Sequence, residues 1–148
     1  ERAGSTNVIR LHGSLHHPRC QRCHRPHTLP PDPPDMPDMP IEGKAIAPPQ
    51  CSHCGSKVRP GVVWFGEPLT DDDWGQAKQA IRTCDALLSV GTSSVVYPAA
   101  VLPFEAAERG ACVVQINPLP TDLDAVAHYN LHGKAGEVLP QLYQALWS

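Results

Sequence analysis

Three things are scarce or missing in this sequence, and each narrows what the protein can be. Aromatic residues make up only 5% of the chain, so a core must be built mainly from Val, Leu, Ile and Ala. No dense run of Lys or Arg is present and the formal net charge is -3, which argues against a nucleic-acid-binding protein with a basic face. No apolar run approaches the roughly 20 residues of a membrane-spanning helix, and no signal peptide is visible. We therefore expect a cytoplasmic protein whose partners are neither nucleic acid nor membrane.

Four of the six cysteines form two C-x-x-C pairs, Cys20 with Cys23 and Cys51 with Cys54. In a reducing compartment such pairs are more often metal ligands than disulfides. Each pair occupies a tight turn that points two sulfurs at one spot, and two pairs make a complete tetrahedral shell for Zn²⁺. A zinc ion with four protein ligands has no open position for water. The sequence therefore predicts a structural zinc site.

Other interpretations of the cysteines and their neighbours are weaker. Residues 20–24 also match C-x-x-C-H, the attachment motif of c-type haem, but haem would leave the second cysteine pair unexplained. Cys84 and Cys112 lie alone in apolar surroundings, where we expect small buried hydrophobic side chains. Five histidines near the pairs could replace a cysteine on the metal, although four thiolates make this unnecessary: His16, His17, His24, His27 and His53.

The segment between the two cysteine pairs is crowded with proline. Nine of the 17 prolines of the chain fall between Cys23 and Cys51. Proline removes backbone donors and blocks both helices and central strands. We expect residues 30–40 to form an exposed, polyproline-like or disordered loop, which either docks a partner or is simply tethered by zinc at both ends.

Apolar periodicity predicts secondary structure most clearly after residue 60. Thr70 offers a helix N-cap, followed by three aspartates in the first turn, where negative charge suits the helix dipole. Trp74, Ala77, Ile81 and Cys84 then fall on one face at helical spacing.

Two continuous apolar runs, residues 86–93 and 111–117, are typical of strands buried on both faces of a parallel sheet. Pro98 can open the helix between them and Gly110 can close it. We expect further strands or extended segments at 8–12, before a turn at Gly13, and at 62–67, and a last helix at 137–146. This order predicts an α/β fold with a parallel sheet and no internal repeat.

Small and polar residues follow both of these predicted strands. Gly91, Thr92 and Ser93 end one strand, and Asn117 with Pro118 ends the next. In open parallel sheets ligands bind outside the carboxyl ends of the strands, and these groups suit phosphate or ribose oxygens. An ordinary strand-to-helix turn explains the same residues, so the pattern leaves both interpretations open.

His12 precedes Gly13 at the end of an apolar segment. A histidine is the usual general base near neutral pH, but a lone histidine in such a place more often has a structural role. The residues alone leave that choice open.

Taken together, the segments resemble the sirtuin family of NAD-dependent protein-lysine deacylases. The similarity extends over nearly the whole chain outside the proline-rich segment. It is closest to the bacterial and mitochondrial-type branch that includes desuccinylases. The matching segments are residues 7–15 with the histidine, the two C-x-x-C pairs, residues 59–67, residues 91–99, Ile116 with Asn117, and residues 133–136.

The resemblance implies a role for each matching residue. His12 is the general base that acts on the nicotinamide ribose after the acyl oxygen has displaced nicotinamide. The cysteines Cys20, Cys23, Cys51 and Cys54 hold the family's structural zinc. NAD is held by Gly91, Thr92, Ser93, Asn117, Pro118, Leu119 and Ala135. The acyl-lysine substrate contacts Val62, Trp64 and Phe65 along its stem, and Val95, Val96 and Tyr97 along its backbone.

The resemblance also implies a domain organisation. Residues 1–17 carry the histidine segment, residues 18–60 form the inserted zinc module, and residues 61–148 form the C-terminal part of a Rossmann-like NAD-binding domain. The family's glycine-rich phosphate loop and its Gln-Asn-Ile-Asp segment lie upstream of the histidine and are not in this sequence. We therefore expect a fragment with apolar sheet faces exposed, poorly stable and inactive by itself. Acetyl and succinyl groups both remain open as substrates.

Rival functions make different predictions. A non-catalytic, zinc-stabilised remnant would bind peptide or NAD without turnover, and a related activity would transfer ADP-ribose. A nucleic-acid-binding zinc ribbon would show salt-sensitive DNA binding. We expect acylated lysine in proteins as the partner, and a monomer when the protein is intact.

Overall fold

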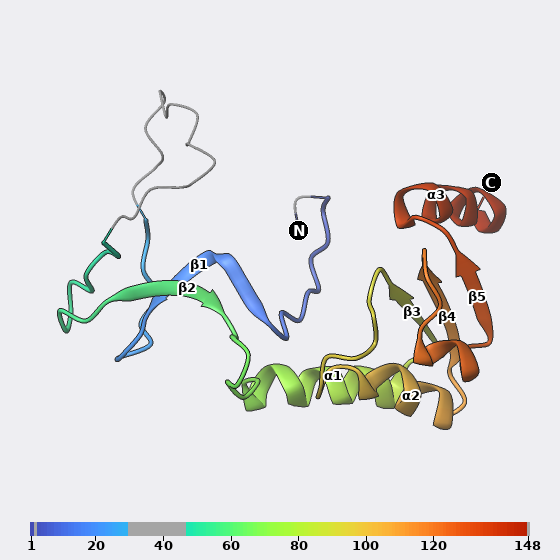
Figure 1. The fold of residues 1–148 in the computed structure, drawn as a ribbon, viewed down its shortest axis with the longest axis horizontal. Helices are drawn as coiled ribbons and strands as arrows, with labels where there is room; N and C mark the ends of the chain where they lie inside the picture. Colours follow the sequence, from blue (N-terminus) through green and yellow to red (C-terminus); the bar gives the residue numbers. More distant parts are fainter. Residues whose placement is uncertain (2, 30–46, 148) are drawn as a thin grey trace. The chain divides into compact units, whose positions relative to one another are not determined.

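The computed structural model describes residues 1, 3–29 and 47–147 (Figure 1). The chain divides into two compact units, Glu1–Leu69 and Thr70–Ser148, and each has its own sheet. The loop predicted at residues 30–40 lies outside the described residues. No helix of the described part is long and apolar enough to cross a membrane.

The first unit is built on an antiparallel ribbon of β1 (Gly13–Cys20) and β2 (Val58–Val62). The ribbon is irregular, because the register shifts between Ser14 and Arg19. Its small core consists of the buried Cys20, Cys51 and Val58, against which Cys23 and Cys54 pack. So small an apolar core is too little to hold a unit of this size by burial alone.

The strands of this unit do not lie where the sequence pattern placed them. Residues 8–12 form no strand, and β1 begins at Gly13, the expected turn. The N–H of Gly13 donates to the Arg10 carbonyl at 2.8 Å, which closes a turn before the strand. Gly13 then has a φ of 73°, and a Cβ there would lie 2.0 Å from the Gly61 carbonyl oxygen. Close approach of the two backbones therefore requires glycine at this position.

The apolar segment 62–67 is only partly a strand. Pairing ends at Val62, and the N–H of Glu67 donates to the Trp64 carbonyl at 2.9 Å, so residues 64–67 form a turn. A strand was expected because these side chains are apolar and β-prone. Without a neighbouring strand among the described residues, the segment turns instead and exposes its aromatic rings.

The second unit begins with α1 (Asp71–Thr83), which confirms the predicted cap and apolar face. The Thr70 side chain accepts a hydrogen bond from the Asp73 N–H, and Asp71, Asp72 and Asp73 occupy the first turn. Ala77 and Ile81 are buried on one face. Trp74 and Cys84 on the same face are half-buried.

The sheet of the second unit is parallel, in the order β3–β4–β5. Both predicted strands are confirmed, and α2 lies between them, although it begins at Val101 and not at Pro98. Gly110, with a φ of 88°, ends α2 as expected. The 3₁₀ helix η1 and strand β5 fall in a stretch that sequence patterns left irregular. The bounds are β3 (Ala86–Val90), α2 (Val101–Glu108), β4 (Cys112–Asn117), η1 (Asp122–Ala125), β5 (Tyr129–His132) and α3 (Ala135–Trp147).

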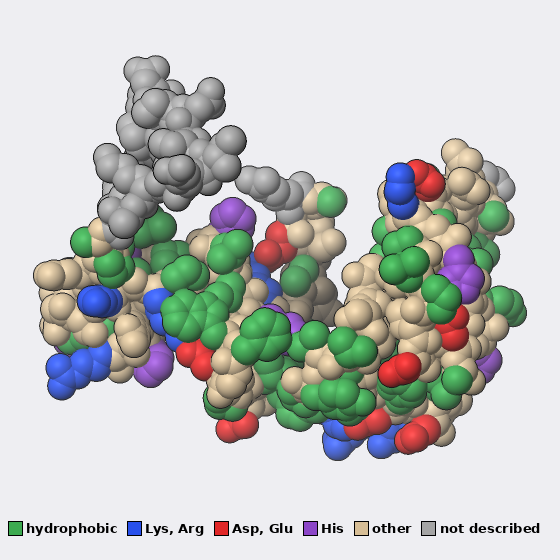
Figure 2. Space-filling model, in the orientation of Figure 1, with side chains coloured by type: hydrophobic (Ala, Val, Ile, Leu, Met, Phe, Trp, Pro, Cys, Tyr) green, Lys and Arg blue, Asp and Glu red, His purple; other side chains and the backbone are tan. Residues whose placement is uncertain are grey.

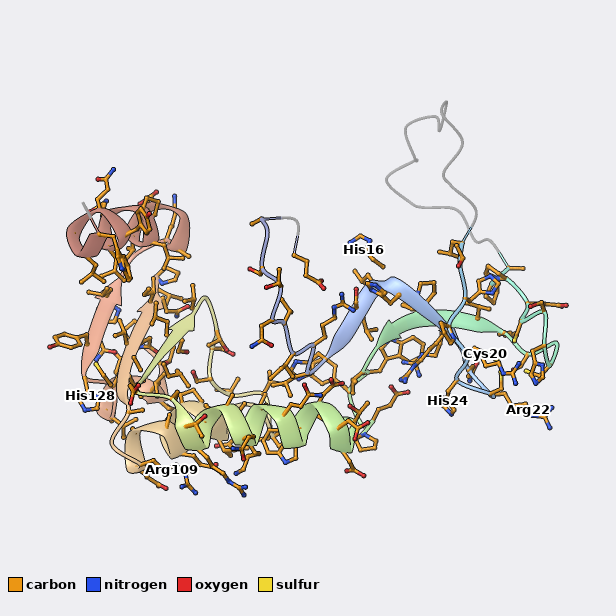
Figure 3. All side chains as sticks on the ribbon, turned by 180° about the vertical axis from the view of Figure 1, so that it is seen from behind. His16, Cys20, Arg22, His24, Arg109 and His128 are labelled. Carbon is orange, nitrogen blue, oxygen red and sulfur yellow. The ribbon has the colours of Figure 1, made fainter. Side chains whose placement is uncertain are left out.

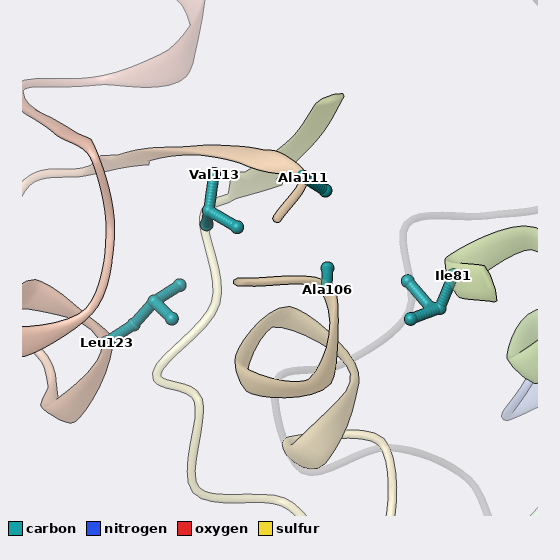
Figure 4. Packing of buried hydrophobic residues seen from close by; sticks show 5 residues of the cluster. All are labelled: Ile81, Ala106, Ala111, Val113 and Leu123. Carbon is teal, nitrogen blue, oxygen red and sulfur yellow. The ribbon is translucent and has the colours of Figure 1, made fainter. Parts of the chain in front are cut away.

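The apolar core of this unit lies where α1, α2, β4 and η1 meet. Figure 4 shows its five buried side chains: Ile81, Ala106, Ala111, Val113 and Leu123. Cys84 packs at the border of this core and is half-buried, as is Cys112, rather than fully buried as expected.

Strand β3 is not buried on both faces. It forms an edge of the described sheet, and Leu88 and Val90 are 49% and 38% exposed. Their register partners on β4, Val114 and Ile116, are better covered, since α3 packs against β4. Apolar composition predicted burial of β3, but only the neighbouring segments decide whether an apolar face is covered.

Candidate functional site

The four cysteine sulfurs of the C-x-x-C pairs converge in the first unit. All four Sγ atoms lie within 4.8 Å of one another, and none forms a disulfide. The Sγ atoms of Cys20 and Cys54 are 3.5 Å apart, and those of Cys23 and Cys51 are 3.7 Å apart. Four thiolates at about 2.3 Å from a tetrahedral Zn²⁺ would be about 3.8 Å apart, so the cluster fits this ion.

The two cysteine pairs form near-identical turns in separate parts of the first unit. We call these turns the knuckles. The His24 N–H donates to the Cys20 carbonyl at 3.1 Å, and the Gly55 N–H donates to the Cys51 carbonyl at 2.9 Å. His24 and Gly55 also share left-handed backbone, with φ values of 58° and 70°. The structure thus contains a repeat that the sequence does not display outside its cysteines.

Hydrogen bonds and neighbouring sulfurs shift the pKa values of the cysteine thiols in the first knuckle. The Cys23 N–H, and also the Arg22 N–H, point at the Cys20 sulfur and outweigh burial, lowering the pKa of Cys20 to about 6. For Cys23, the Arg25 N–H lowers the pKa, but burial and the three neighbouring sulfurs raise it, leaving the pKa at about 11. Four sulfurs so close cannot all be negative without a cation, and this favours a metal at their centre.

His12 lies in the same unit, directly before β1. Its side chain is exposed, and its carbonyl accepts a hydrogen bond from the Val63 N–H at 2.9 Å. That bond joins the predicted base to the segment of Val62, Trp64 and Phe65. Trp64 is 52% and Phe65 is 96% exposed, so the segment presents aromatic surface.

Arg59 and Glu67 stabilise the conformation of this aromatic segment. The sequence pattern gave neither residue an individual role. Arg59 donates to Glu67 and, at 2.9 Å, to the Val62 carbonyl, while its guanidinium lies 3.7 Å from the centre of the Trp64 ring. The Arg59 side chain, with the Trp64 N–H, lowers the pKa of Glu67 to about 2. The stability that this pair contributes is therefore fully present above the ordinary Glu pKa of about 4.3 and is lost only as the pH falls towards 2.

In the second unit, three strand ends meet at one edge of the sheet. β3, β4 and β5 are parallel, so Gly91–Ser93, Asn117–Leu119 and His132–Ala135 lie side by side, at or just after the carboxyl ends of these strands. The Gly91 N–H donates to the Ile116 carbonyl at 2.9 Å, and the Gly133 N–H donates to the Asn117 carbonyl at 3.2 Å. All seven residues predicted to hold NAD thus lie at this edge.

The predicted peptide-binding residues of this unit follow the same edge. Val95, Val96 and Tyr97 are 59%, 42% and 71% exposed and belong to no strand of the described sheet. Beside them, Ser94 has a φ of 57° and a buried hydroxyl without a hydrogen-bond partner in the described residues. Exposed apolar side chains in a row are typical of a surface that binds another chain.

A buried polar network supports the loop after β4. Gln115 is 1% exposed, and its side chain contacts Thr121 and Asp124 of the loop and Asn130 of β5, the last at 3.0 Å. The Thr121 N–H donates to Asp124 at 2.9 Å and is the main cause of the lowered pKa of Asp124, with smaller contributions from Gln115 and His132. Gln115 therefore links the connection after β4 to strand β5.

We predict that Gln115→Leu lowers the free energy of unfolding by about 1–3 kcal/mol, because it leaves the buried groups of Thr121, Asp124 and Asn130 without partners. Urea denaturation followed by circular dichroism measures this. Gln79→Leu, at an exposed position of α1, is the matched control and should change the midpoint little. Equal midpoints for the two variants would show that the network does not support the loop.

Comparisons with known proteins agree on one family. A model of the Sir2 family matches residues 1–98. An NAD-dependent protein deacylase of Methylococcus capsulatus is 56% identical over 146 residues, covering 99% of this chain and 56% of that protein.

Two solved structures are also similar. A Sir2 homolog–NAD complex superposes with a TM-score of 0.85 at 43% identity, covering 97% of this chain and 52% of the other. The structure of Sir2Tm bound to a propionylated peptide superposes with a TM-score of 0.80 at 29% identity, covering 97% and 58%. The chain therefore spans little more than half the length of the proteins that it matches.

Proposed function

This chain belongs to the Sir2 family, and from that premise we propose that it serves the NAD-dependent removal of acyl groups from protein lysines. The observation that carries this proposal is the edge where the ends of β3, β4 and β5 meet. It gathers small and polar residues from three separate loops, as a dinucleotide site requires. The Sir2 homolog–NAD complex, at 43% identity, supports the same ligand.

NAD is the co-substrate in this proposal. Gly91 permits close approach of the backbone, and the hydroxyls of Thr92 and Ser93 donate to phosphate or ribose oxygens. On the next loop Asn117, Pro118 and Leu119 contact the adenosine side, with Ala135 at the start of α3. Gln115 holds the second of these loops in place through Thr121 and Asp124.

His12 serves as the general base. Once nicotinamide has left, the exposed imidazole of His12 accepts a proton from a ribose hydroxyl that attacks the acyl carbon. Water supplies the remaining oxygen, and the products are free lysine, O-acyl-ADP-ribose and nicotinamide. The lysine stem lies along Val62, Trp64 and Phe65, which Arg59 and Glu67 keep in position. The substrate backbone pairs with Val95, Val96 and Tyr97 by strand addition. The acyl group is of the acetyl or succinyl type.

Zinc has a structural role in this proposal. Cys20, Cys23, Cys51 and Cys54 hold it, and the closed four-sulfur shell leaves it no part in the chemistry. We propose the organisation stated above, with residues 1–17, 18–60 and 61–148 as histidine segment, zinc module and part of the NAD-binding domain. We further propose a monomer in the cytoplasm, without nucleic-acid or membrane partners.

The proposed activity predicts that the complete gene product releases nicotinamide and deacylated peptide in equal amounts from NAD and an acyl-lysine peptide. Mass spectrometry of both products measures this, with acetyl and succinyl peptides compared side by side. An unacylated lysine peptide is the control and should release little nicotinamide.

Two results would contradict the proposal. Nicotinamide release without deacylated peptide would indicate ADP-ribose transfer instead. Binding of NAD or peptide with no product at all would indicate a non-catalytic binding protein.

A further inference from the structure

The two knuckles carry a cluster of exposed cationic side chains that the proposed reaction does not use. Arg22 and Arg25 lie on the first knuckle and Lys57 follows the second, and all three are exposed. We call these three residues the knuckle patch. Figure 3 shows Arg22 and His24 beside Cys20 at the end of the β1–β2 ribbon, and Figure 2 shows blue and purple side chains gathered there.

Backbone hydrogen bonds hold the members of the patch close together. The Cys20 N–H donates to the Arg25 carbonyl at 2.9 Å, and the Gln21 N–H donates to the Lys57 carbonyl at 2.9 Å. The turn that holds Arg22 is itself fixed by N–H···S bonds to Cys20. The three cations thus lie together on a rigid end of the unit that the zinc site holds in place. Because the patch is already ordered, little conformational entropy is lost when a ligand pairs with it.

The charges of the patch are not balanced within the described part of its unit. Residues 3–29 and 47–66 contain no Asp or Glu, and the four acidic residues between these ranges, Asp32, Asp35, Asp38 and Glu42, lie outside the described residues. The acidic side chains at the ends of this unit are engaged elsewhere, because Glu1 pairs with Arg10 and Glu67 pairs with Arg59. Neither Arg22, Arg25 nor Lys57 forms an ion pair with any described residue. Such a patch attracts an anionic partner.

We propose that the knuckle patch binds an acidic segment of a protein substrate. Three cations match two or three carboxylates of a short peptide, whereas DNA-binding proteins typically neutralise about six to ten phosphates. The identity of the docked segment as substrate rests on the proposed deacylase function; the binding itself does not.

The ribbon sets the distance between the patch and the proposed base. β2 and its flanking residues lead from Lys57 to Val63, whose N–H binds the His12 carbonyl. A stretch of about six residues in extended conformation spans at most about 20 Å. A substrate in extended conformation covers the same distance with an equal length of chain. Acidic residues about six positions from the acylated lysine should therefore reach the patch.

Fluorescence anisotropy tests the proposal with the complete gene product and no NAD. The probe is a labelled peptide with four glutamates six positions from an unacylated lysine, compared with the same peptide carrying four glutamines. We expect the glutamate peptide to bind about tenfold more tightly at low salt, as two or three exposed ion pairs would give. The difference should shrink at high salt.

Matched variants locate the binding. Arg22→Glu with Arg25→Glu should abolish the preference for glutamate and create one for a lysine-containing peptide. Arg82→Glu with Arg109→Glu makes the same charge change at exposed positions of the second unit and should leave the preference intact. Zinc content, measured on both variants, verifies that the knuckles are formed.

Two outcomes would overturn the proposal. One is equal binding of the glutamate and glutamine peptides, or a preference that survives reversal of Arg22 and Arg25. The other is a DNA duplex that binds more tightly than the acidic peptide and depends on the same two arginines, which would make the patch a nucleic-acid surface. Because no turnover is measured, failure of the deacylase activity would not affect either readout.

Discussion

Replacement of His12 by alanine should lower kcat/KM for NAD-dependent deacylation by about 10²–10⁴-fold, the usual contribution of a general base. The complete gene product is the protein to use, with nicotinamide release and deacylated peptide as the two measurements. The expected loss is large because the proposed reaction assigns this proton transfer to His12 alone.

His16→Ala is the matched control for this experiment. His16 is also exposed and lies further along the same segment, on β1, where its side chain has no assigned role. It should keep near-normal activity, and both variants should retain zinc and a normal unfolding transition. If His12→Ala retained more than a tenth of the wild-type rate, another group would have to be the base.

A second large effect is expected at the metal. Removal of zinc by a chelator, or Cys51→Ser, should unfold the ribbon of β1 and β2, because zinc binding by such sites is worth roughly 10–16 kcal/mol. The core of this unit consists mainly of the four cysteines themselves, so few other contacts remain to hold it. Zinc content by atomic emission and backbone NMR spectra of the first unit measure the two effects.

Cys84→Ser serves as the control for the cysteine change. Cys84 lies in the second unit, where its sulfur donates to the Ile81 carbonyl at 3.6 Å. The Cys84→Ser variant should therefore keep one zinc ion per chain. Full zinc content in Cys51→Ser would contradict the four-cysteine shell. An unchanged NMR spectrum after chelation would contradict the structural role of the metal.

Local features of the sequence predicted many elements of this structure. The cap at Thr70 and the acidic first turn predicted α1, since both act within the first turn of the helix. Continuous apolar runs predicted β3 and β4, and Gly110 predicted the end of α2. The spacing of the cysteine pairs predicted a four-sulfur cluster, because a C-x-x-C turn directs both sulfurs to one side.

Other features arise only when distant segments meet. The start of β1 at Gly13 depends on pairing with Val62, which is remote in the sequence, and no local pattern can report that pairing. Strand β5 is short and has too little periodicity to be recognised, so only its pairing with β4 defines it. Gln115 looks like an isolated polar residue in an apolar strand, until Thr121 and Asn130 supply its partners.

The sequence by itself therefore determined the four-cysteine cluster, the first helix and the alternating order of strands and helices in the second unit, because caps, spacing and apolar runs act between near neighbours. Only the tertiary structure decided which strands pair, which apolar faces are covered and how Arg59 and Glu67 hold the aromatic segment. It also brought Arg22, Arg25 and Lys57 together, although the whole proline-rich segment separates Lys57 from the two arginines along the chain. Hydrogen bonds and ion pairs between remote segments depend on the distance between them in space, which cannot be inferred from their separation along the chain.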